Sequence, residues 1–251
     1  MNSESTILTI DIGNTALKVC VFEGERLIQS SIGCIAEAAQ AREAVEAMLV
    51  FNSVDGAAYC CVGQEKRELV EMLRTEYGLP VVTLDAETPL PLEICYDTRS
   101  TLGADRIAAA VGCMDDTKAT LVVDAGTAVT SDVVADRKFL FGNISPGLKL
   151  RFRSLHDFTS RLPLVHPEGE LPEFGHDTVT ALRAGVVNGL LAEIADDYRK
   201  VSEMFDNPRI VLTGGDAPFL APLLAKRSIT AELDAQSVGR GLVRIFNYNN
   251  N

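Results

Sequence analysis

Short apolar or alternating stretches open the chain. Residues 6–12, 16–22 and 26–31 have strand character, and the turn Glu23-Gly24-Glu25 joins the second stretch to the third. Strands separated by such short turns pair side by side in antiparallel order. The pattern therefore predicts three antiparallel strands at the start of the fold.

Helical and strand patterns then alternate through the first half. Apolar residues recur at helical spacing over 36–51, 65–77 and 103–114, whereas 57–62 and 80–84 read as strands. A polar connection with prolines spans 85–91. Because such alternation is typical of an α/β sandwich, a first α/β domain is expected over 1–117.

The second half, 118–251, opens in the same way. A strand over 119–123 ends at Asp124, and a Gly-Thr turn leads into a strand over 128–134. The remaining predicted elements are a long amphipathic helix over 178–205, a strand over 209–212, and helices over 217–224 and 237–246. The polar tail 247–251 is expected to fray.

The two openings share a short motif. Ile10-Asp11-Ile12-Gly13-Asn14-Thr15 and Val123-Asp124-Ala125-Gly126-Thr127 both place Asp-x-Gly after an apolar strand, about half a chain apart. This self-similarity indicates a weak internal duplication, with a first domain over 1–117 and a second over 118–251.

Composition narrows the class of partner. The 251 residues are 47% hydrophobic and 23% charged, which suffices for one sizeable core or two modest ones. Asp and Glu number 35 against 23 Lys and Arg, and the net charge of −12 repels polyphosphate backbones and anionic membranes. Neither nucleic acid nor a membrane is therefore expected as a partner. A small anionic ligand would need backbone amides, local cations or a bound metal.

The same sequence indicates a cytoplasmic protein with free thiols. No apolar run approaches the roughly 20 residues of a membrane-spanning helix, and the amino end lacks the basic start of a secretory signal.

The six cysteines form no C-x-x-C pair, and Cys60 and Cys61 are expected in the core. His156, His166 and His176 lack metal-ligand spacing and are expected to be exposed.

The two Asp-x-Gly turns are the candidates for chemistry, because the chain has neither G-x-x-x-x-G-K-[ST] nor G-x-G-x-x-G. Glycine lets backbone amides approach a phosphate, threonine adds a hydroxyl donor, and an aspartate at a strand end can hold a cation. A carboxylate that faces phosphates needs a metal between them. A lone turn of this kind is more typical of an ordinary strand corner, whereas two copies followed by a Gly-Gly turn favour a ligand site.

Several motifs, in order along the chain, resemble the phosphate and adenosine motifs of the acetate kinase, sugar kinase, Hsp70 and actin superfamily. They are Asp11-Ile12-Gly13-Asn14-Thr15 with Lys18, then Asp124-x-Gly126-Thr127-Ala128-x-Thr130, then Gly214-Gly215. The resemblance implies an α/β fold of two duplicated ribonuclease-H-like domains, the actin-like ATPase fold, with an interdomain ATP cleft.

More narrowly, the chain resembles the type III pantothenate kinases over nearly its whole length. The motifs are Gly103-Ala104-Asp105-Arg106 after Tyr96, Gly142-Asn143-Ile144-Ser145-Pro146-Gly147-Leu148 followed by Leu162-Pro163, and Gly239-x-Gly241. The resemblance implies ATP-dependent phosphorylation of pantothenate to 4'-phosphopantothenate, the first step of coenzyme A biosynthesis. It also implies a cytoplasmic homodimer, Mg²⁺ with ATP, and a monovalent cation, K⁺ or NH₄⁺.

The resemblance carries the family's site residues over position by position. Asp105 matches the general base, and Asp124 would hold the monovalent cation. The ATP site would comprise Asp11, Ile12, Gly13, Asn14, Thr15, Ala16, Leu17, Lys18, Thr127, Gly214 and Gly215, and the pantothenate site Tyr96, Gly103, Ala104, Asp105, Arg106 and Thr178. Asp11 would also hold Mg²⁺ through water. Phosphoryl transfer asks mainly for in-line positioning, charge neutralisation and one proton acceptor, which this set supplies.

Two positions depart from the family pattern. Asn143 stands where a second glycine is common, and asparagine tolerates the left-handed backbone that such a turn can need. Arg99 stands where proline is frequent and is expected to loosen the approach to the acceptor pocket.

Two other functions stay open. The chain could be another small-molecule kinase of the same superfamily, or a nucleotide-binding regulator without turnover. Tyr96 and the segment 103–106 favour pantothenate as the acceptor, and the presence of Asp105 favours an enzyme. The net charge of −12 also argues against a DNA-binding regulator.

Overall fold

A computed structural model describes residues 5–34, 38–63 and 66–250. The chain divides into two compact units. Unit 1 comprises 1–114, 137–140 and 236–251, and unit 2 comprises 115–136 and 141–235. The final helix and a four-residue segment thus group with the first unit. The domain bounds 1–117 and 118–251 stay a prediction.

Unit 1 is a five-stranded sheet with helices on both faces. Its elements are β1 (Thr6–Ile12), β2 (Ala16–Glu23), β3 (Arg26–Cys34), α1 (Ala38–Phe51), β4 (Gly56–Cys61), α2 (Arg67–Thr75), β5 (Val81–Thr83), β6 (Glu93–Ile94), η1 (Arg99–Thr101), α3 (Ala104–Cys113) and α8 (Ser237–Asn250). The strand order is β3-β2-β1-β4-β5. The β1–β2 and β2–β3 pairs are antiparallel, as predicted, and β1–β4 and β4–β5 are parallel.

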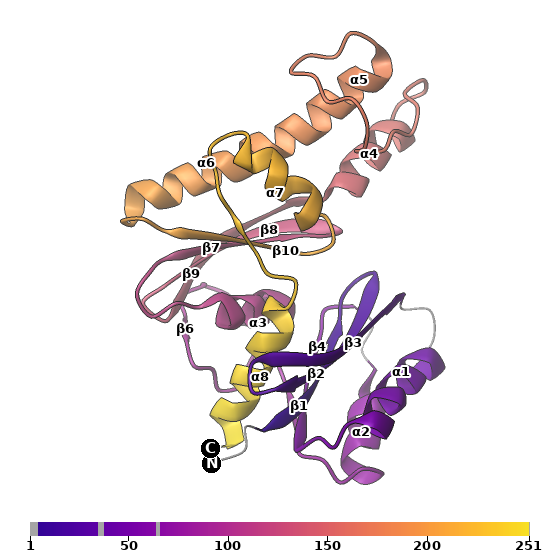
Figure 1. Cartoon of the computed structure of the whole chain (residues 1–251), viewed down its shortest axis with the longest axis vertical. Helices are drawn as coiled ribbons and strands as arrows, with labels where there is room; N and C mark the ends of the chain where they lie inside the picture. Colours follow the sequence, from indigo (N-terminus) through magenta and orange to yellow (C-terminus); the bar gives the residue numbers. More distant parts are fainter. Residues whose placement is uncertain (1–4, 35–37, 64–65, 251) are drawn as a thin grey trace. The chain divides into compact units, whose positions relative to one another are not determined.

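The alternation along β1 assigns its two faces. Leu8, Ile10 and Ile12 are fully buried in the core that α1 and α2 close. Asp11 therefore points to the opposite face, against which α8 packs (Figure 1). The helix α3 packs closely along α8, because a Cβ on Gly241 would lie only 1.8 Å from the Ala108 carbonyl oxygen. The predicted helices over 103–114 and 237–246 thus pack together in one layer.

Unit 2 repeats the same plan. Its elements are β7 (Thr120–Ala125), β8 (Ala128–Ala135), β9 (Lys138–Pro146), α4 (Leu148–Asp157), α5 (Thr178–Arg183), the π-helix η2 (Ala184–Asn188), α6 (Gly189–Met204), β10 (Arg209–Thr213), α7 (Ala217–Ala225) and β11 (Glu232–Leu233). The second sheet has six strands in the order β11-β10-β7-β8-β9-β6, in which β6 pairs with the start of β9. Without β6, the order β9-β8-β7-β10-β11 matches β3-β2-β1-β4-β5 of the first sheet. The predicted duplication is confirmed by this shared topology.

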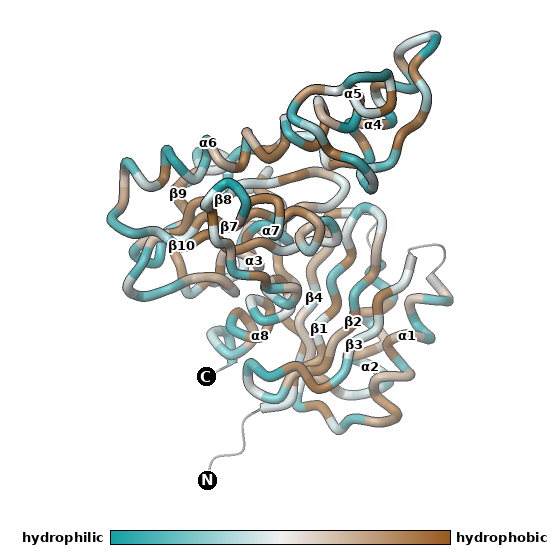
Figure 2. The backbone as a smooth tube through the Cα atoms, turned by 45° about the horizontal axis from the view of Figure 1, so that its top comes forward, coloured by the Kyte–Doolittle hydropathy of each residue, from teal (hydrophilic) through white to brown (hydrophobic). Residues whose placement is uncertain are grey.

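The long helix predicted over 178–205 is present as α5, η2 and α6. Alternating polar and apolar positions run along α6 (Figure 2), and Leu190, Leu191 and Ile194 are buried where it packs on β7 and β8. By length and composition alone, Thr178–Met204 would also pass as a membrane span. Because a helix that covers a sheet passes the same test, we interpret it as the core helix of unit 2.

One expectation about local structure is wrong, and one helix was not expected. The tail does not fray at residues 247–250, since α8 continues to Asn250 and the Asn249 amide donates to the Pro89 carbonyl at 3.0 Å. The segment after Pro146 forms the helix α4, which the sequence did not indicate because charged residues interrupt its apolar face. Residues 36 and 37 of the predicted helix over 36–51 lie outside the described residues.

The described cysteines differ in burial: Cys60 is buried as expected, whereas Cys61 is only half-buried against the core and Cys95 is exposed. Cys20, Cys60, Cys61, Cys95 and Cys113 are free thiols, and the Cys34 side chain lies outside the described part. His156, His166 and His176 are exposed. Within residues 5–34, 38–63 and 66–250 no three His, Cys, Asp or Glu side chains gather as a metal cluster.

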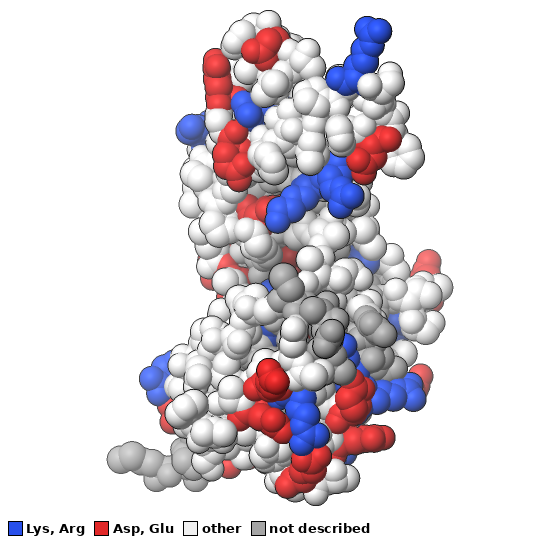
Figure 3. Space-filling view, turned by 90° about the vertical axis from the view of Figure 1, so that its right-hand side faces the viewer, with Lys and Arg blue, Asp and Glu red and all other residues white. Residues whose placement is uncertain are grey.

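Charges of both signs mix on the surface. The face that carries α1 and α2 shows acidic and basic side chains side by side (Figure 3), and Arg42 pairs there with Glu46 and Glu76 at 2.7 and 2.6 Å. Such exposed pairs contribute little to stability.

Candidate active site

The first Asp-x-Gly turn joins β1 to β2. The Gly13 amide donates to the Ala16 carbonyl at 3.0 Å, which closes the turn. Gly63, after β4, approaches so closely that a Cβ there would lie 2.4 Å from the Gly13 carbonyl oxygen. Asn14 and Thr15, at the tip, are exposed. Contacts with Ala16 and Gly63 thus fix the base of the loop at Gly13, while Asn14 and Thr15 at its tip are accessible to a ligand.

Asp11 and Lys18 lie opposite each other where β1 and β2 pair. Burial raises the pKa of the Asp11 carboxyl, and the Lys18 ammonium lowers it. The Asp105 carboxylate adds to the increase in the pKa of Asp11. Asp11, Lys18 and Asp105 are therefore electrostatic neighbours, although Asp105 is far away in sequence.

Asp105 sits in the first turn of α3. Its Oδ1 accepts a hydrogen bond from the Arg106 amide at 2.8 Å, and a carboxylate at this end of a helix is stabilised by the positive helix terminus. Burial is the largest influence and raises the pKa of Asp105, whereas Arg106 and Lys18 lower it. A half-buried carboxylate with a raised pKa is suited to accept a proton.

Tyr96 and Arg106, both predicted to contact the acceptor, lie together. The Arg106 Cζ atom is 5.7 Å from the centroid of the Tyr96 ring. Phe139 joins them, with its ring centroid 5.7 Å from the same atom. Sequence reasoning missed Phe139, because an apolar residue at the start of a strand carries no chemical signal of its own.

The second Asp-x-Gly turn joins β7 to β8 in unit 2. The Gly126 amide donates to the Ala128 carbonyl at 2.9 Å, and the Gly147 amide donates to the Thr127 carbonyl at 3.0 Å. Gly147 has no room for a side chain, because a Cβ would lie 2.0 Å from the Gly126 carbonyl oxygen. The N-terminus of α4 is thereby packed against the turn that carries Thr127.

The Gly214-Gly215 turn after β10 lies against the same strand end. Gly214 has a φ of +86°, and a Cβ there would lie 2.4 Å from both the Ala125 carbonyl oxygen and the Asp124 Oδ1. Only glycine fits this backbone and this distance. Unit 2 therefore holds Asp124, Thr127, Gly214 and Gly215 around neighbouring turns.

A polar cavity of about 600 Å³ adjoins Gly103 and Ala104 in unit 1. Arg99 lines it, and its Nη2 donates to the Thr88 carbonyl at 2.6 Å. The expected loosening at Arg99 is therefore wrong, since its guanidinium ties η1 to the loop after β5. The Thr88 hydroxyl in turn donates a hydrogen bond to Asp85 Oδ1 at 2.8 Å.

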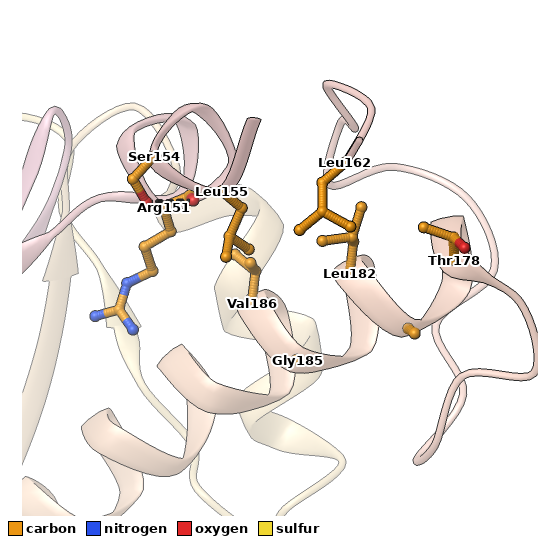
Figure 4. A pocket seen from close by; sticks show the side chains of 9 residues that line it. Arg151, Ser154, Leu155, Leu162, Thr178, Leu182, Gly185 and Val186 are labelled. Carbon is orange, nitrogen blue, oxygen red and sulfur yellow. Dashed lines mark hydrogen bonds between the residues drawn. The ribbon is translucent and has the colours of Figure 1, made fainter. Parts of the chain in front are cut away.

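Thr178 lies in unit 2, at the first position of α5, and is exposed. It lines a second cavity of about 550 Å³ between α4 and the α5–η2 helix, where Leu155 points toward Val186 and Leu162 toward Leu182 (Figure 4). The other predicted acceptor residues belong to unit 1.

Asn143 on β9 is held by α6. Its Nδ2 donates to Asp197 Oδ1 at 3.1 Å, and Asp197 is 8% exposed. The asparagine at this departure from the family pattern thus gives a buried carboxylate a partner, which glycine could not do.

Comparisons with known proteins agree with this arrangement. A family model for type III pantothenate kinase matches residues 7–200. A type III pantothenate kinase from Bacteroides fragilis is 40% identical over 246 residues, covering 97% of this chain and 98% of the relative. Another from Porphyromonas gingivalis is 38% identical over 248 residues, covering 96% and 98%.

The chain belongs to the type III pantothenate kinase family. This family phosphorylates pantothenate for coenzyme A biosynthesis, with ATP and a divalent metal. The pantothenate kinase activity that the motifs predicted is therefore confirmed by the family to which the chain belongs.

Solved structures of the family's wider fold agree as well. A putative Baf family transcriptional activator from Campylobacter jejuni has a TM-score of 0.63 at 24% identity, covering 97% of this chain and 98% of that one. An activator of 2-hydroxyisocaproyl-CoA dehydratase from Clostridium difficile with bound ADPNP has a TM-score of 0.55 at 11% identity, covering 98% and 95%. These likenesses concern the fold, and confirm the actin-like ATPase fold expected for this pantothenate kinase family member.

Proposed function

We propose that this chain transfers the γ-phosphoryl group of ATP to the primary hydroxyl of pantothenate, giving 4'-phosphopantothenate and ADP. The observation that carries the proposal is the neighbourhood of Asp105, Asp11 and Lys18 in unit 1. It combines a proton acceptor, a carboxylate for a metal and a cation for phosphate oxygens, which are the parts that phosphoryl transfer requires.

In the proposed reaction, Asp105 accepts the proton of the acceptor hydroxyl as its oxygen attacks the γ-phosphorus. The bond from the γ-phosphorus to the bridging oxygen breaks, and ADP leaves with that electron pair. Lys18 and the amides of the Gly13 turn stabilise the phosphate charge. The raised pKa of Asp105 supports this role, because it brings the carboxylate closer to the basicity that proton transfer needs.

Two carboxylates are proposed to serve the nucleotide. Asp11 would hold Mg²⁺ through water, and its donor set fits, because a partly buried carboxylate beside Asp105 is stabilised by a nearby cation. Asp124, against Gly214, would hold K⁺ or NH₄⁺ beside ATP, with Thr127, Gly214 and Gly215 as nucleotide contacts. When bound, Mg²⁺ neutralises phosphate charge and the monovalent cation adds positive charge near the nucleotide.

The acceptor is proposed to contact Tyr96, the segment 103–106 and Thr178.

The protein is also proposed to be a cytoplasmic homodimer. Apolar side chains at the surface of unit 2 support self-association, since Phe158 and Phe174 are 88% and 90% exposed. A second copy that covers these phenylalanines would remove them from water. Sedimentation equilibrium measures the oligomeric state, and a monomer at micromolar concentration would contradict the dimer.

A direct assay tests the proposed reaction. The chain is incubated with ATP, Mg²⁺, K⁺ and labelled pantothenate, and phosphorylated product is separated. Asp105→Asn should lower turnover by about two to four orders of magnitude while ATP still binds. Asp97→Asn, an exposed carboxylate in the same region, is the matched control.

The same assay addresses the two other functions. Another small-molecule kinase would phosphorylate a sugar or acetate in place of pantothenate, and a regulator would bind ATP without product. Absence of phosphopantothenate from the wild-type chain would overturn the proposal.

A further inference from the structure

Arg106 is enclosed by two aromatic rings. Only 6% of the residue is exposed, and its Cζ lies 5.7 Å from the ring centroids of both Tyr96 and Phe139. The two rings meet edge to face, with centroids 6.1 Å apart and planes at 80°. Rings at this distance attract a guanidinium through their negative faces.

Phe139 reaches this group through a short strand pairing. β6 pairs with the start of β9, so that Ile94 and Phe139 are partners, and the Cys95 amide donates to the Phe139 carbonyl at 2.8 Å. Tyr96 follows directly after Cys95. The backbone therefore fixes Phe139 beside the Tyr96 segment, and the Phe139 ring is fully buried.

The placement of Phe139 in the chain is unusual. Residues 137–140 group with unit 1, although 115–136 and 141–235 on either side belong to unit 2. The four residues 137–140 thus contribute to unit 1 the Phe139 ring that lies beside Arg106. If residue 139 served only apolar packing, any apolar side chain of similar volume would suffice at this position. A neighbouring guanidinium is attracted specifically by the face of an aromatic ring.

We propose that Phe139 is a positioning residue for acceptor binding, which acts by holding the Arg106 guanidinium together with Tyr96. Arginine has many side-chain conformers in water, and a side chain ordered in advance loses less entropy when a ligand binds. Phe139 itself need not contact the acceptor. The inference rests on the proposed contact between Arg106 and pantothenate.

Steady-state kinetics of single variants of the full chain test the inference. Phe139→Leu removes the ring and should raise the KM for pantothenate by roughly 3- to 30-fold, the span of one cation–π contact. The KM for ATP should change by less than about twofold, since Arg106 is not assigned to ATP, and kcat should change as little when it is measured at a pH well above the pKa of Asp105, which Arg106 lowers. Phe139→Tyr retains a ring face and should remain near the wild type.

A matched variant separates positioning from packing. Phe22→Leu truncates another fully buried phenylalanine of unit 1. It should lower thermal stability about as much as Phe139→Leu and leave the KM for pantothenate unchanged. If Phe139→Leu does not fold, Phe139→Met carries the same test with a more adaptable side chain.

A double-mutant cycle with Arg106→Lys tests the route through the guanidinium. If Phe139 acts through Arg106, the second substitution adds little to the KM increase of the first. Fully additive effects, equal increases in both KM values, or an unchanged KM in Phe139→Leu would each overturn the inference. If Arg106→Lys alone leaves the KM for pantothenate unchanged while the product still forms, the proposed Arg106 contact fails and the inference fails with it, but the reaction stands. Absence of product from the wild type would instead refute the proposed function.

Discussion

The Cys60 thiol donates a hydrogen bond to the Asp11 carboxylate, with Sγ 3.5 Å from Oδ1. The two residues are partners in the parallel pairing of β1 with β4, so the backbone sets their distance. Cys60 is 1% exposed, and burial raises the pKa of its thiol well above the ordinary value, which keeps it a donor. The carboxylate proposed for Mg²⁺ is therefore oriented by a buried thiol.

Removal of that donor should weaken the use of Mg·ATP. We expect Cys60→Ala to raise the KM for Mg·ATP by about 3- to 10-fold, the effect of one modest hydrogen bond, with the KM for pantothenate unchanged. Cys60→Ser retains a donor and should remain closer to the wild type. Cys20→Ala, which truncates a buried cysteine of the neighbouring strand β2, is the control. Equal effects of Cys60→Ala and Cys20→Ala would make Cys60 a packing residue.

The pH profile should report on Asp105. Its carboxylate must be ionised to accept a proton, and burial raises its pKa above 3.8. Activity is therefore complete above the raised pKa and is lost as the pH falls through it. We expect kcat/KM for pantothenate to decline on the acid side at a higher pH than an ordinary aspartate would give.

Lys18 provides a check on this assignment. Its ammonium lowers the pKa of Asp105, so Lys18→Met should shift the acid limb further toward neutral pH, whatever it does to the maximal rate. A limb that stays in place or shifts to lower pH would remove Lys18 from the neighbourhood of the titrating group.

The monovalent cation should matter through Asp124. Replacement of K⁺ by Na⁺ is expected to raise the KM for ATP, and Asp124→Ala should raise it by about tenfold or more, as the loss of a charged contact does. The Asp124→Ala variant should no longer distinguish the two salts. Asp136→Ala, at an exposed turn after β8, is the control. Wild-type activity that is equal in both salts would contradict the proposed cation site.

The close approach of Gly147 to the Thr127 turn should make a methyl group harmful there. Gly147→Ala would place a Cβ 2.0 Å from the Gly126 carbonyl oxygen, so the backbone must move. We expect a loss of about 1–3 kcal/mol in the free energy of unfolding and weaker ATP binding. Gly189→Ala meets nothing within 4 Å and should be neutral or stabilising. Thermal unfolding and calorimetric titration of ATP compare the two variants, and an unchanged Gly147→Ala protein would show that the turn adapts.

Much of the fold follows from local patterns. Alternation and short turns predicted β1 to β3, and helical spacing predicted α2 and α3, because these periodicities arise within a few residues. The two Asp-x-Gly turns could be located for the same reason, since a glycine turn after an apolar strand is a local signal. The exposed position of the three histidines also followed from their polar surroundings.

Other elements could not be predicted because their partners are distant. The polar residues 247–250 were expected to be solvated. In the structure the Ser5 hydroxyl donates a hydrogen bond to Asn247 Oδ1 at 3.2 Å, and α8 continues to Asn250. Arg99 looked disruptive until the structure supplied the Thr88 carbonyl as its partner. A polar residue read alone does not reveal where its hydrogen bonds are satisfied.

Local patterns in the sequence were enough to indicate the α/β class and the duplicated strand–turn motif, and the resemblance of the motifs to a kinase family implied the chemistry proposed for Asp11, Asp105 and Asp124. Tertiary structure alone placed Asp11, Lys18 and Asp105 in one electrostatic neighbourhood and closed two rings around Arg106. The physical reason is range. Periodicity and turn chemistry act over a few residues, whereas burial and electrostatics depend on segments that only the folded chain brings together.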